Sequence, residues 1–431
     1  MALAISLLER LGQAVLGLLL NPFYYIGVLI ILLQMRRQIF FERRLYHSRL
    51  HTLPGESVRI VLWGLASGLL GSLLMALIGA YLQPQAVIYM WAAALLLALI
   101  RIRFLCFSYV IGLLGIAHAV LGWVPLDAGE SYYPFIEPLI ELHMPSLLVL
   151  AGIAHILEAL LIRVQGERLA TPVFIEGKRG KLIGSYQFQG LWPVPLLLLV
   201  PSSASGQALP YTPLLGGSEM WSAGWMFLAM PLMIGFTNMT STLLPKQKIR
   251  RTAGQLLIYG VVVAGLGVLT EWVPFLLLPA ALLTIALHEL ILWLAARGEN
   301  MRSPIYVHAA GGLTVLAVLP GSAAMEMGIQ AGEVIHKVNG QQVRTKEELH
   351  QALRLNPAFS RLEVIDHRGE HRFVQRALFE GDHHQLGIIL CPDDSAEFYI
   401  KPKRFNMFRE MRSTLGRHRY HQETHDGGIS G

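Results

Sequence analysis

The sequence predicts a polytopic α-helical membrane domain followed by a small soluble α+β domain. Of its 431 residues, 53% are hydrophobic and only 15% are charged, and the mean hydropathy is +0.48. Soluble chains carry about 25% charged residues. The charges are unevenly spread: residues 1–300 contain 19 Lys+Arg and 14 Asp+Glu, about 11%, whereas residues 301–431 contain 16 and 15, about 24%. This distribution excludes a wholly soluble chain and separates a membrane part from a soluble part.

The membrane part, residues 1–300, contains about eight or nine apolar segments of the length needed to cross a bilayer, which is about 20 residues for a helix. Two are weaker than the rest. Asn21-Pro22 interrupts one, so that residues 1–34 either cross once or dip in and return; prolines at 193, 195 and 201 remove backbone donors from the other. The clear segments are 58–82, 86–100, 104–124, 144–162, 221–243, 254–270 and 273–296, and the weaker ones are 12–34 and 191–203.

Basic residues between the segments predict the orientation of the chain, because Lys and Arg concentrate on the cytoplasmic side of membrane proteins. The segment that contains Asp127 and Glu141 has no Lys or Arg, and we expect it outside. Counting through the last segment places residue 301 onward in the cytoplasm. The basic residues expected inside are Arg36, Arg37, Arg43, Arg44, Arg49, Arg101, Arg103, Arg163, Arg168, Lys178, Arg179, Lys181, Lys246, Lys248, Arg250 and Arg251.

The internal segment 165–190 predicts a cytoplasmic β-hairpin. Two β-rich runs, beginning at Thr171 and Lys181, are separated by Lys178-Arg179-Gly180. Two interpretations remain open. The segment is either a short basic connector near anionic lipid or a docking surface for a partner.

The sequence argues against catalysis. Its two cysteines, Cys106 and Cys391, are too few for a disulfide framework, and we expect no metal site built on thiolates. His288-Glu289 begins like the H-E-x-x-H motif of a zinc protease, but Leu292 stands where the second histidine is required. No Ser/His/Asp set or phosphate-binding loop is visible. We therefore expect no catalytic residue, no metal and no cofactor.

Other polar residues fall within the apolar segments, where an unpaired ionisable group is costly. They include His118, Asn238 and the pair His155 and Glu158, which lie one helical turn apart and can contact each other. We interpret this pair as a packing or ion-pair feature. A transport or proton path is the alternative.

Residues 303–394 predict the soluble domain. The elements are a strand from Gly312, a short helix from Pro320, a strand from Glu333 ending in an Asn-Gly turn, a capped helix from Thr345 to about Leu355, and two final β runs. The order resembles a bacterial PDZ domain, whose runs P-G-S-P-A, A-G-L-x-x-G-D-x-I and N-G-x-x-V are matched at 320–324, 327–335 and 339–343. The departures are Ala323 for Pro, Met327 for Ala and Glu333 for Asp.

A PDZ domain binds an extended peptide as an added strand, in a groove closed by a helix. The matching helix is 345–355, and its residues at spacings i, i+3 and i+4 share one face, of which we expect about half to be free for a ligand. In circularly permuted relatives, the loop that holds the ligand's carboxylate resembles an L-G-I run, and Leu386-Gly387-Ile388 fits it. The alternative position for this loop is the segment 304–306. The predicted peptide-binding residues are Leu349, Ala352, Leu353, Leu386, Gly387 and Ile388.

The end of the chain, residues 395–431, is predicted to be a basic, flexible tail. Between Lys401 and Arg419 it has seven Lys/Arg and one acid, with Phe405 and Phe408 among them. Such a segment either meets anionic lipid or an acidic partner, or remains solvated and disordered. His418, His421 and His425 are weak candidates for metal binding.

The whole arrangement resembles the MinJ-type topological determinants of cell division from Gram-positive bacilli, over nearly the full length. The resemblance rests on N-P-F-Y-Y near residue 21, the Arg-rich first loop, T-P-V-F-I-E-G-K-R-G-K-L-I-G from Thr171, W-P-V-P from Trp192, and a single C-terminal PDZ domain. It implies a non-enzymatic membrane scaffold that bridges a polar DivIVA-type protein to the septum inhibitors MinC and MinD.

The resemblance also implies partners and a location. The partners are the DivIVA-type protein, MinD and other division proteins, the lipid bilayer, and a peptide or protein ligand at the PDZ groove, with no nucleic acid. The location is the cell membrane, enriched at septum and poles, with the PDZ domain in the cytoplasm. The alternative is a degenerate or regulatory site-2-protease-like protein with a substrate-sensing PDZ domain.

Overall fold

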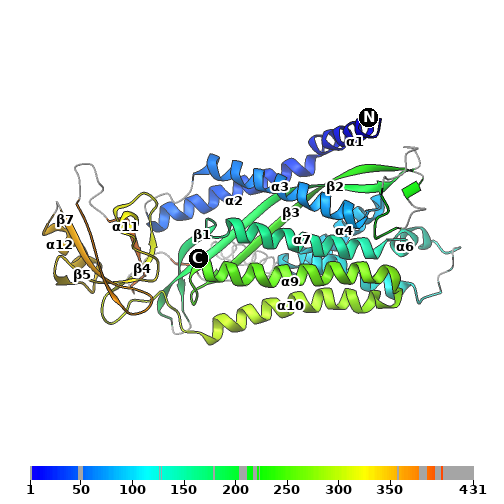
Figure 1. Cartoon of the computed structure of the whole chain (residues 1–431). Coiled ribbons are helices and arrows are strands. Elements are labelled where there is room, and N and C mark those ends of the chain that lie inside the picture. Colours follow the sequence, from blue (N-terminus) through cyan, green and yellow to red (C-terminus); the bar gives the residue numbers. More distant parts are fainter. Residues whose placement is uncertain are drawn as a thin grey trace, which may run out of the picture.

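The structure is a computed structural model of the chain, in which an elongated helical part carries a small β-rich domain at one end (Figure 1). We call residues 303–393 the C-terminal domain, the adjoining end of the helical part the domain end, and the opposite end, near α6 (Tyr133–Ile140), the far end. The structure describes residues 2–46, 52–125, 127, 129–177, 180–202, 211–216, 221–222, 224–356, 359–377, 386–393 and 399–400. The predicted basic tail lies almost wholly outside these residues.

The first two helices together run from the far end to the domain end. Helix α1 (Ala2–Leu19) ends before Asn21, whose side chain accepts a hydrogen bond from Phe23 N, and α2 (Pro22–Tyr46) follows with its proline in the first turn. Arg10 of α1 donates to the carbonyl of Trp225 at the far end. Gln38 of α2 donates to Thr171 at the domain end. The kinked segment therefore crosses the helical part once.

In the part of the chain that the structure describes, five helices are long and apolar enough to cross a membrane. Besides α2 they are α3 (Leu53–Ile78), α7 (Met144–Gln165), α9 (Pro245–Trp272) and α10 (Leu277–Met301, preceded by the short η3, Pro274–Leu276). Helix α7 is the central one, because 72% of the residues in its most apolar stretch are buried inside the protein. Helices α3, α9 and α10 and strand β3 contact α7, and the long helices leave apolar side chains outward, as expected for contact with lipid.

The segments 86–100 and 104–124, predicted to cross separately, instead enter from the far end and return to it. Helix α4 (Pro84–Ile100) and helix α5 (Phe107–Leu121) are joined by the short helix η1 (Ile102–Leu105). At this turn Arg103 bonds Glu289, and Cys106 lies beside His288, both halfway along α10. Arg101 and Arg103 therefore lie about midway along the helical part and not at its domain end, where the other basic residues expected inside gather.

The segments 191–203 and 221–243, predicted as membrane spans of a helical domain, contain β-strands. Strand β1 (Ala170–Glu176) pairs with β2 (Leu182–Pro201), which pairs with β3 (Trp225–Thr240), all antiparallel. Strands β2 and β3 run between the helices along the length of the helical part (Figure 1). At about 3.3 Å per residue, each is long enough to cross the roughly 30 Å core of a bilayer.

The prolines that weakened the span prediction suit the outer edge of β2. Pro195 lies opposite Pro231, and neither can donate, so this is a pair without ladder hydrogen bonds. By alternation, residues 193, 195, 197, 199 and 201 direct their nitrogen atoms away from β3. Pro193, Pro195 and Pro201 have no N–H there, and the N–H of Leu197 donates to Ser72 of α3 at 2.8 Å. The outward N–H of Leu199 remains, but the other four positions offer no free donor along this covered edge.

Helix α3 covers this edge at very close range. A Cβ atom added to Gly64 or Gly68 would lie 2.2 Å from the carbonyl oxygen of Pro193 or Pro195, respectively. Only glycine lets the helix backbone approach the strand backbone so closely. The two glycines are one turn apart and match the two-residue spacing of the prolines.

The C-terminal domain contains a five-strand sheet path with the order β8-β7-β5-β4-β9 and a short strand, β6, that pairs with β5. Its apolar core is separate from that of the helical part and forms between the sheet and helix α12. The elements are β4 (Leu313–Val318), α11 (Ala323–Glu326), β5 (Val334–Val338), β6 (Gln341–Gln342), α12 (Lys346–Arg354), β7 (Phe359–Ile365), β8 (His371–Ala377) and β9 (Ile388–Leu390).

The C-terminal domain is docked on the three-stranded sheet. Gly184 N of β2 donates to the carbonyl of Tyr306 at 2.9 Å, and the Tyr186 hydroxyl donates to the carbonyl of Leu316 at 2.5 Å. The rings of Tyr186 and Tyr306 pack edge to face, and Tyr306 is fully buried. The predicted hairpin at 165–190 is thus present as β1 and the start of β2, and the surface it forms is used by the chain's own C-terminal domain.

Candidate functional site

The first candidate site lies where β9 ends the sheet of the C-terminal domain. Among the described residues, β9 pairs with β4 on one side and has no strand partner on the other. Gly387 O accepts from Leu319 N, and Cys391 N donates to Thr314 O, so residues 387, 389 and 391 face β4. By alternation, the N–H groups of Ile388 and Leu390 point away from it. They offer the main-chain groups that an added strand would need.

Of the six predicted peptide-binding residues, Leu386, Gly387 and Ile388 lie at or beside the start of β9, whereas Leu349, Ala352 and Leu353 lie on α12. Leu349, Ala352 and Leu353 of α12 are between 0 and 9% exposed and form part of the domain's own core. The expectation that about half of this helix face is free is therefore wrong. Ile388 and Leu390 are partly buried against the same core, and these β9 residues have the exposed surface that a ligand could contact.

The position of α12 is set by its first turn. Thr345 accepts from Glu348 N, and Glu348 accepts from the backbone of Thr345, which is the predicted capping box. The amide of Asn339 donates to the carbonyl of Ala352 and connects the helix to the turn after β5. Such caps each contribute about 1 kcal/mol to stability.

The predicted carboxylate loop is built around Gly387. This residue has φ +73°, a conformation that favours glycine. An added Cβ would also lie 2.2 Å from Cβ of Ser322, so both the backbone conformation and the space require glycine. The carbonyl of Leu386 accepts from Ala324 N, which ties the loop to α11. The loop is therefore held rigidly beside the start of β9.

Charged groups hold the rest of the C-terminal domain. Glu333, which stands where the PDZ motif has Asp, is 3% exposed and accepts both from Arg372 at 2.9 Å and from Gln330 N. On the exposed face, Glu363 loses some solvation, which raises its pKa, but hydrogen bonds from Lys337 and His371 outweigh this and hold the pKa below its usual value. These groups stabilise the sheet and lie away from the β9 edge.

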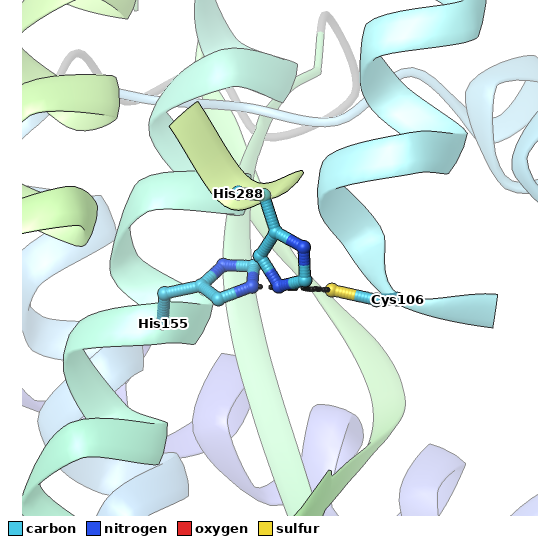
Figure 2. A group of neighbouring side chains, drawn as sticks. All are labelled: Cys106, His155 and His288. Atoms are coloured by element: carbon cyan, nitrogen blue, oxygen red, sulfur yellow. Dashed lines mark hydrogen bonds between the residues drawn. The ribbon is translucent and has the colours of Figure 1, made fainter. Parts of the chain in front are cut away.

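The second candidate site is a buried polar cluster in the helical part, formed by Cys106, His155 and His288 (Figure 2). Cys106 immediately precedes α5, whereas the histidines come from the middle of α7 and α10. Cys106 Sγ lies 3.2 Å from Nε2 of His155 and 3.6 Å from Nε2 of His288. His155 is 2% exposed and His288 is 9% exposed.

Sequence reasoning singled out both histidines but did not bring them together, and it set Cys106 aside. The expected partner of His155, Glu158, is 3.9 Å away, farther than Cys106 or the Ser108 hydroxyl at 3.1 Å. The expectation that two cysteines exclude a thiolate site overlooked one thiolate combined with imidazoles. No spacing signal joins these residues, because they are 49 and 182 positions apart.

The protease-like interpretation of His288-Glu289 finds no support in the geometry. Glu289 accepts hydrogen bonds from Arg103 at 2.6 Å and Tyr109 at 2.8 Å, so it serves to hold the η1 turn. Leu292, where a zinc protease has its second histidine, is 38% exposed on the helix surface. His118, another intramembrane candidate, bonds the carbonyl of Leu139.

Comparison with known proteins identifies both parts of the chain. The PDZ domain family matches residues 314–365. The cell division topological determinant MinJ of Bacillus subtilis (strain 168) is 30% identical over 388 residues, covering 87% of this chain and 93% of that protein. A probable MinJ of Lacticaseibacillus paracasei is 28% identical over 399 residues, 89% of this chain and 99% of that protein.

No solved structure matches this chain significantly. The similarity to the MinJ proteins spans the helical part and the C-terminal domain together, which a shared PDZ module alone would not produce. The chain therefore belongs to the MinJ family of cell division topological determinants.

Proposed function

We propose that this chain is a membrane scaffold that positions the division-site selection machinery, by bridging a polar DivIVA-type protein to the septum inhibitors MinC and MinD. The observation that carries the proposal is a PDZ domain whose β9 edge has no strand partner among the described residues, docked on a helical part with five helices there long and apolar enough to cross a bilayer. Confinement to the membrane raises the local concentration of binding partners, so that individually weak contacts suffice.

The ligand at the PDZ domain is an extended peptide that pairs with β9. Ile388 and Leu390 supply outward main-chain groups, and the loop at Gly387 supplies a rigid start for the strand. Main-chain pairing gives affinity in this mode, and neighbouring side-chain pockets give specificity. Because α12 is buried in the domain core, we expect selectivity to come mainly from residues near β9.

The PDZ domain faces the cytoplasm in this proposal. Basic residues gather at the domain end of the helical part, where Arg163 lies in the last turn of α7, Arg168 follows this helix and Lys246 lies in the first turn of α9. Asp127 and Glu137 lie at the far end. This asymmetry fits the preference of Lys and Arg for the cytoplasmic side. Enrichment at septum and poles would follow from the partners.

The sidedness is tested by labelling in cells. A cysteine placed at exposed Glu347 of α12, in a Cys106→Ser background, should react with a membrane-impermeant maleimide only after the cells are opened. A cysteine at exposed Glu130, at the far end, is the matched control and should react in intact cells. The reverse pattern would contradict a cytoplasmic PDZ domain.

The scaffold role is tested by imaging the partners. In cells whose only copy is this chain, fluorescent MinD and MinC should concentrate at septum and poles, and should spread over the membrane when residues 303–431 are deleted. Unchanged localisation in the deletion would contradict the proposal. Immunoblotting of the membrane fraction controls for loss of the truncated chain.

A single substitution tests the β9 edge more sharply. Leu390→Pro removes one outward N–H and leaves the β4 ladder intact, so it should weaken partner capture by the full-length chain in nanodiscs at least about tenfold. Phe373→Pro, on the opposite edge of the sheet, is the matched control. Asp366 N donates to Glu370 O, and by alternation from this pair the N–H of Phe373 points away from β7. Equal effects of the two prolines would exclude strand addition at β9.

A further inference from the structure

We propose that Cys106, His155 and His288 bind a single Zn²⁺ ion at mid-depth in the helical part. The three side chains come from the η1–α5 turn, α7 and α10, and their ligand atoms all lie within 4.8 Å of one another (Figure 2). Thiolate and imidazole together are the donor set that Zn²⁺ favours. This inference is independent of the PDZ domain and of its partners.

The separations between the donor atoms suit a tetrahedral ion. Zinc–sulfur bonds of about 2.3 Å and zinc–nitrogen bonds of about 2.0–2.1 Å at a tetrahedral angle place sulfur and nitrogen about 3.5 Å apart. The observed Sγ to Nε2 distances are 3.2 Å for His155 and 3.6 Å for His288. Small side-chain adjustments would therefore admit the ion.

Both imidazoles are held with Nε2 free to coordinate. Nδ1 of His155 lies 2.7 Å from the carbonyl of Ala151, which can only accept, so Nδ1 carries the proton. Nδ1 of His288 lies 3.2 Å from the Tyr109 hydroxyl, whose own proton goes to Glu289, so this Nδ1 is also the donor. Histidines that bind metal are usually oriented by such outer hydrogen bonds.

The alternative is a metal-free hydrogen-bond network. Ser108 can donate to Nε2 of His155 at 3.1 Å, and the Cys106 thiol can donate to Nε2 of His288. In that network the thiol keeps its proton, whereas Zn²⁺ binding displaces it and leaves a thiolate. The two states therefore differ in whether Cys106 is available to an alkylating reagent and in whether a metal copurifies.

A bound ion would connect the turn between α4 and α5 to the long helices α7 and α10. Apart from this cluster, the η1 turn is held to α10 by the Arg103–Glu289 pair, whose side chains are 44% and 40% exposed. Three protein ligands leave a fourth position, which a water molecule would occupy, as in other three-ligand zinc sites. Binding would then stabilise the turn at mid-depth.

The test is metal binding to the purified full-length chain, carrying no polyhistidine tag. After chelation, incubation with Zn²⁺ and desalting, we expect about one zinc per chain by mass spectrometry, as for a structural site. Cys106→Ser, which preserves a hydroxyl donor for the network, and His288→Gln should reduce the zinc content severalfold. With Co²⁺ as the probe, the wild type should show a thiolate-to-cobalt absorption band that Cys106→Ser lacks.

Two controls separate this site from other histidines. His118→Gln, on the same helix α5, and the triple change of His418, His421 and His425 to Ala should each retain the zinc. Zn²⁺ should also protect Cys106 of the unaltered chain from alkylation, which needs no variant to fold. Zinc content that is equal in the wild type and Cys106→Ser, or alkylation that is unaffected by Zn²⁺, would overturn the proposal and leave the metal-free network.

Discussion

The outer edges of β2 and β9 are both sheet edges without a full strand partner, yet they are built in opposite ways. On β2, prolines remove outward donors, Ser72 occupies the N–H of Leu197, and the glycines of α3 cover the backbone. On β9, Ile388 and Leu390 keep their outward N–H groups. An edge away from water must be closed, whereas an edge beside water can stay available for a ligand.

The largest effect should come from reopening the covered edge of β2. Gly68→Leu would drive a side chain into the carbonyl of Pro195, and we expect destabilisation of about 3 kcal/mol or more, with loss of monodisperse protein in detergent. Gly265→Leu is the control, because an added Cβ there meets nothing within 4 Å. A soluble, stable Gly68→Leu protein would contradict the close α3–β2 contact.

Gly387→Ala should have the next largest effect, at the open edge. The left-handed φ costs about 1–2 kcal/mol for a non-glycine residue, and the contact with Ser322 adds to it. Hydrogen exchange of the β9 amides should rise accordingly. Gly369 has a similar φ of +83°, but an added Cβ there meets nothing within 4 Å. Gly369→Ala should therefore destabilise the domain less than Gly387→Ala, and the difference measures the contact with Ser322. Equal changes would mean that φ alone matters.

Ser72→Ala should destabilise the helical part by about 1–3 kcal/mol, because it leaves the N–H of Leu197 buried without its acceptor. Thermal unfolding of the full-length chain in detergent measures this. Thr270→Ala is the matched control, since its buried hydroxyl bonds only a carbonyl of its own helix. A melting temperature equal to that of Thr270→Ala would show that the edge donor finds another acceptor.

Tyr186→Phe should have the smallest effect, loosening the docked PDZ domain by about 1 kcal/mol. Burial raises the pKa of the Cys391 thiol to about 12, so this thiol should be alkylated very slowly at pH 8. In a Cys106→Ser background, Tyr186→Phe should speed its alkylation about fivefold. Tyr89→Phe, which loses a hydroxyl contact at the far end, should leave the rate unchanged.

Much of the fold could be predicted from local patterns. The capping box at Thr345, the Asn339-Gly340 turn and the glycines near 321–332 are short-range signals, and the PDZ elements follow from them. The long apolar helices follow from hydropathy. The strands β2 and β3 could not be distinguished from helices in this way, because a fully buried strand is as continuously apolar as a membrane helix.

The errors share a physical origin in tertiary contacts. Prolines at 193 and 195 weaken a helix but suit a strand edge, and which of the two is present depends on the neighbour that covers that edge. Arg101 and Arg103 fit the charge rule for a membrane surface, but the contact with Glu289 places them about midway along the helical part. The Cys106 cluster has no sequence spacing at all, because its members meet only after α5, α7 and α10 have packed.

Strand β2 begins in the surface on which the PDZ domain sits and then, without a break, passes between the apolar helices. A binding domain on a flexible linker adopts many orientations, and in most of them its groove is not aligned with that of a neighbour. Here the domain is docked in one orientation on the helical part. Copies standing side by side would therefore present parallel grooves, and a multivalent ligand of matching repeat could engage several at once.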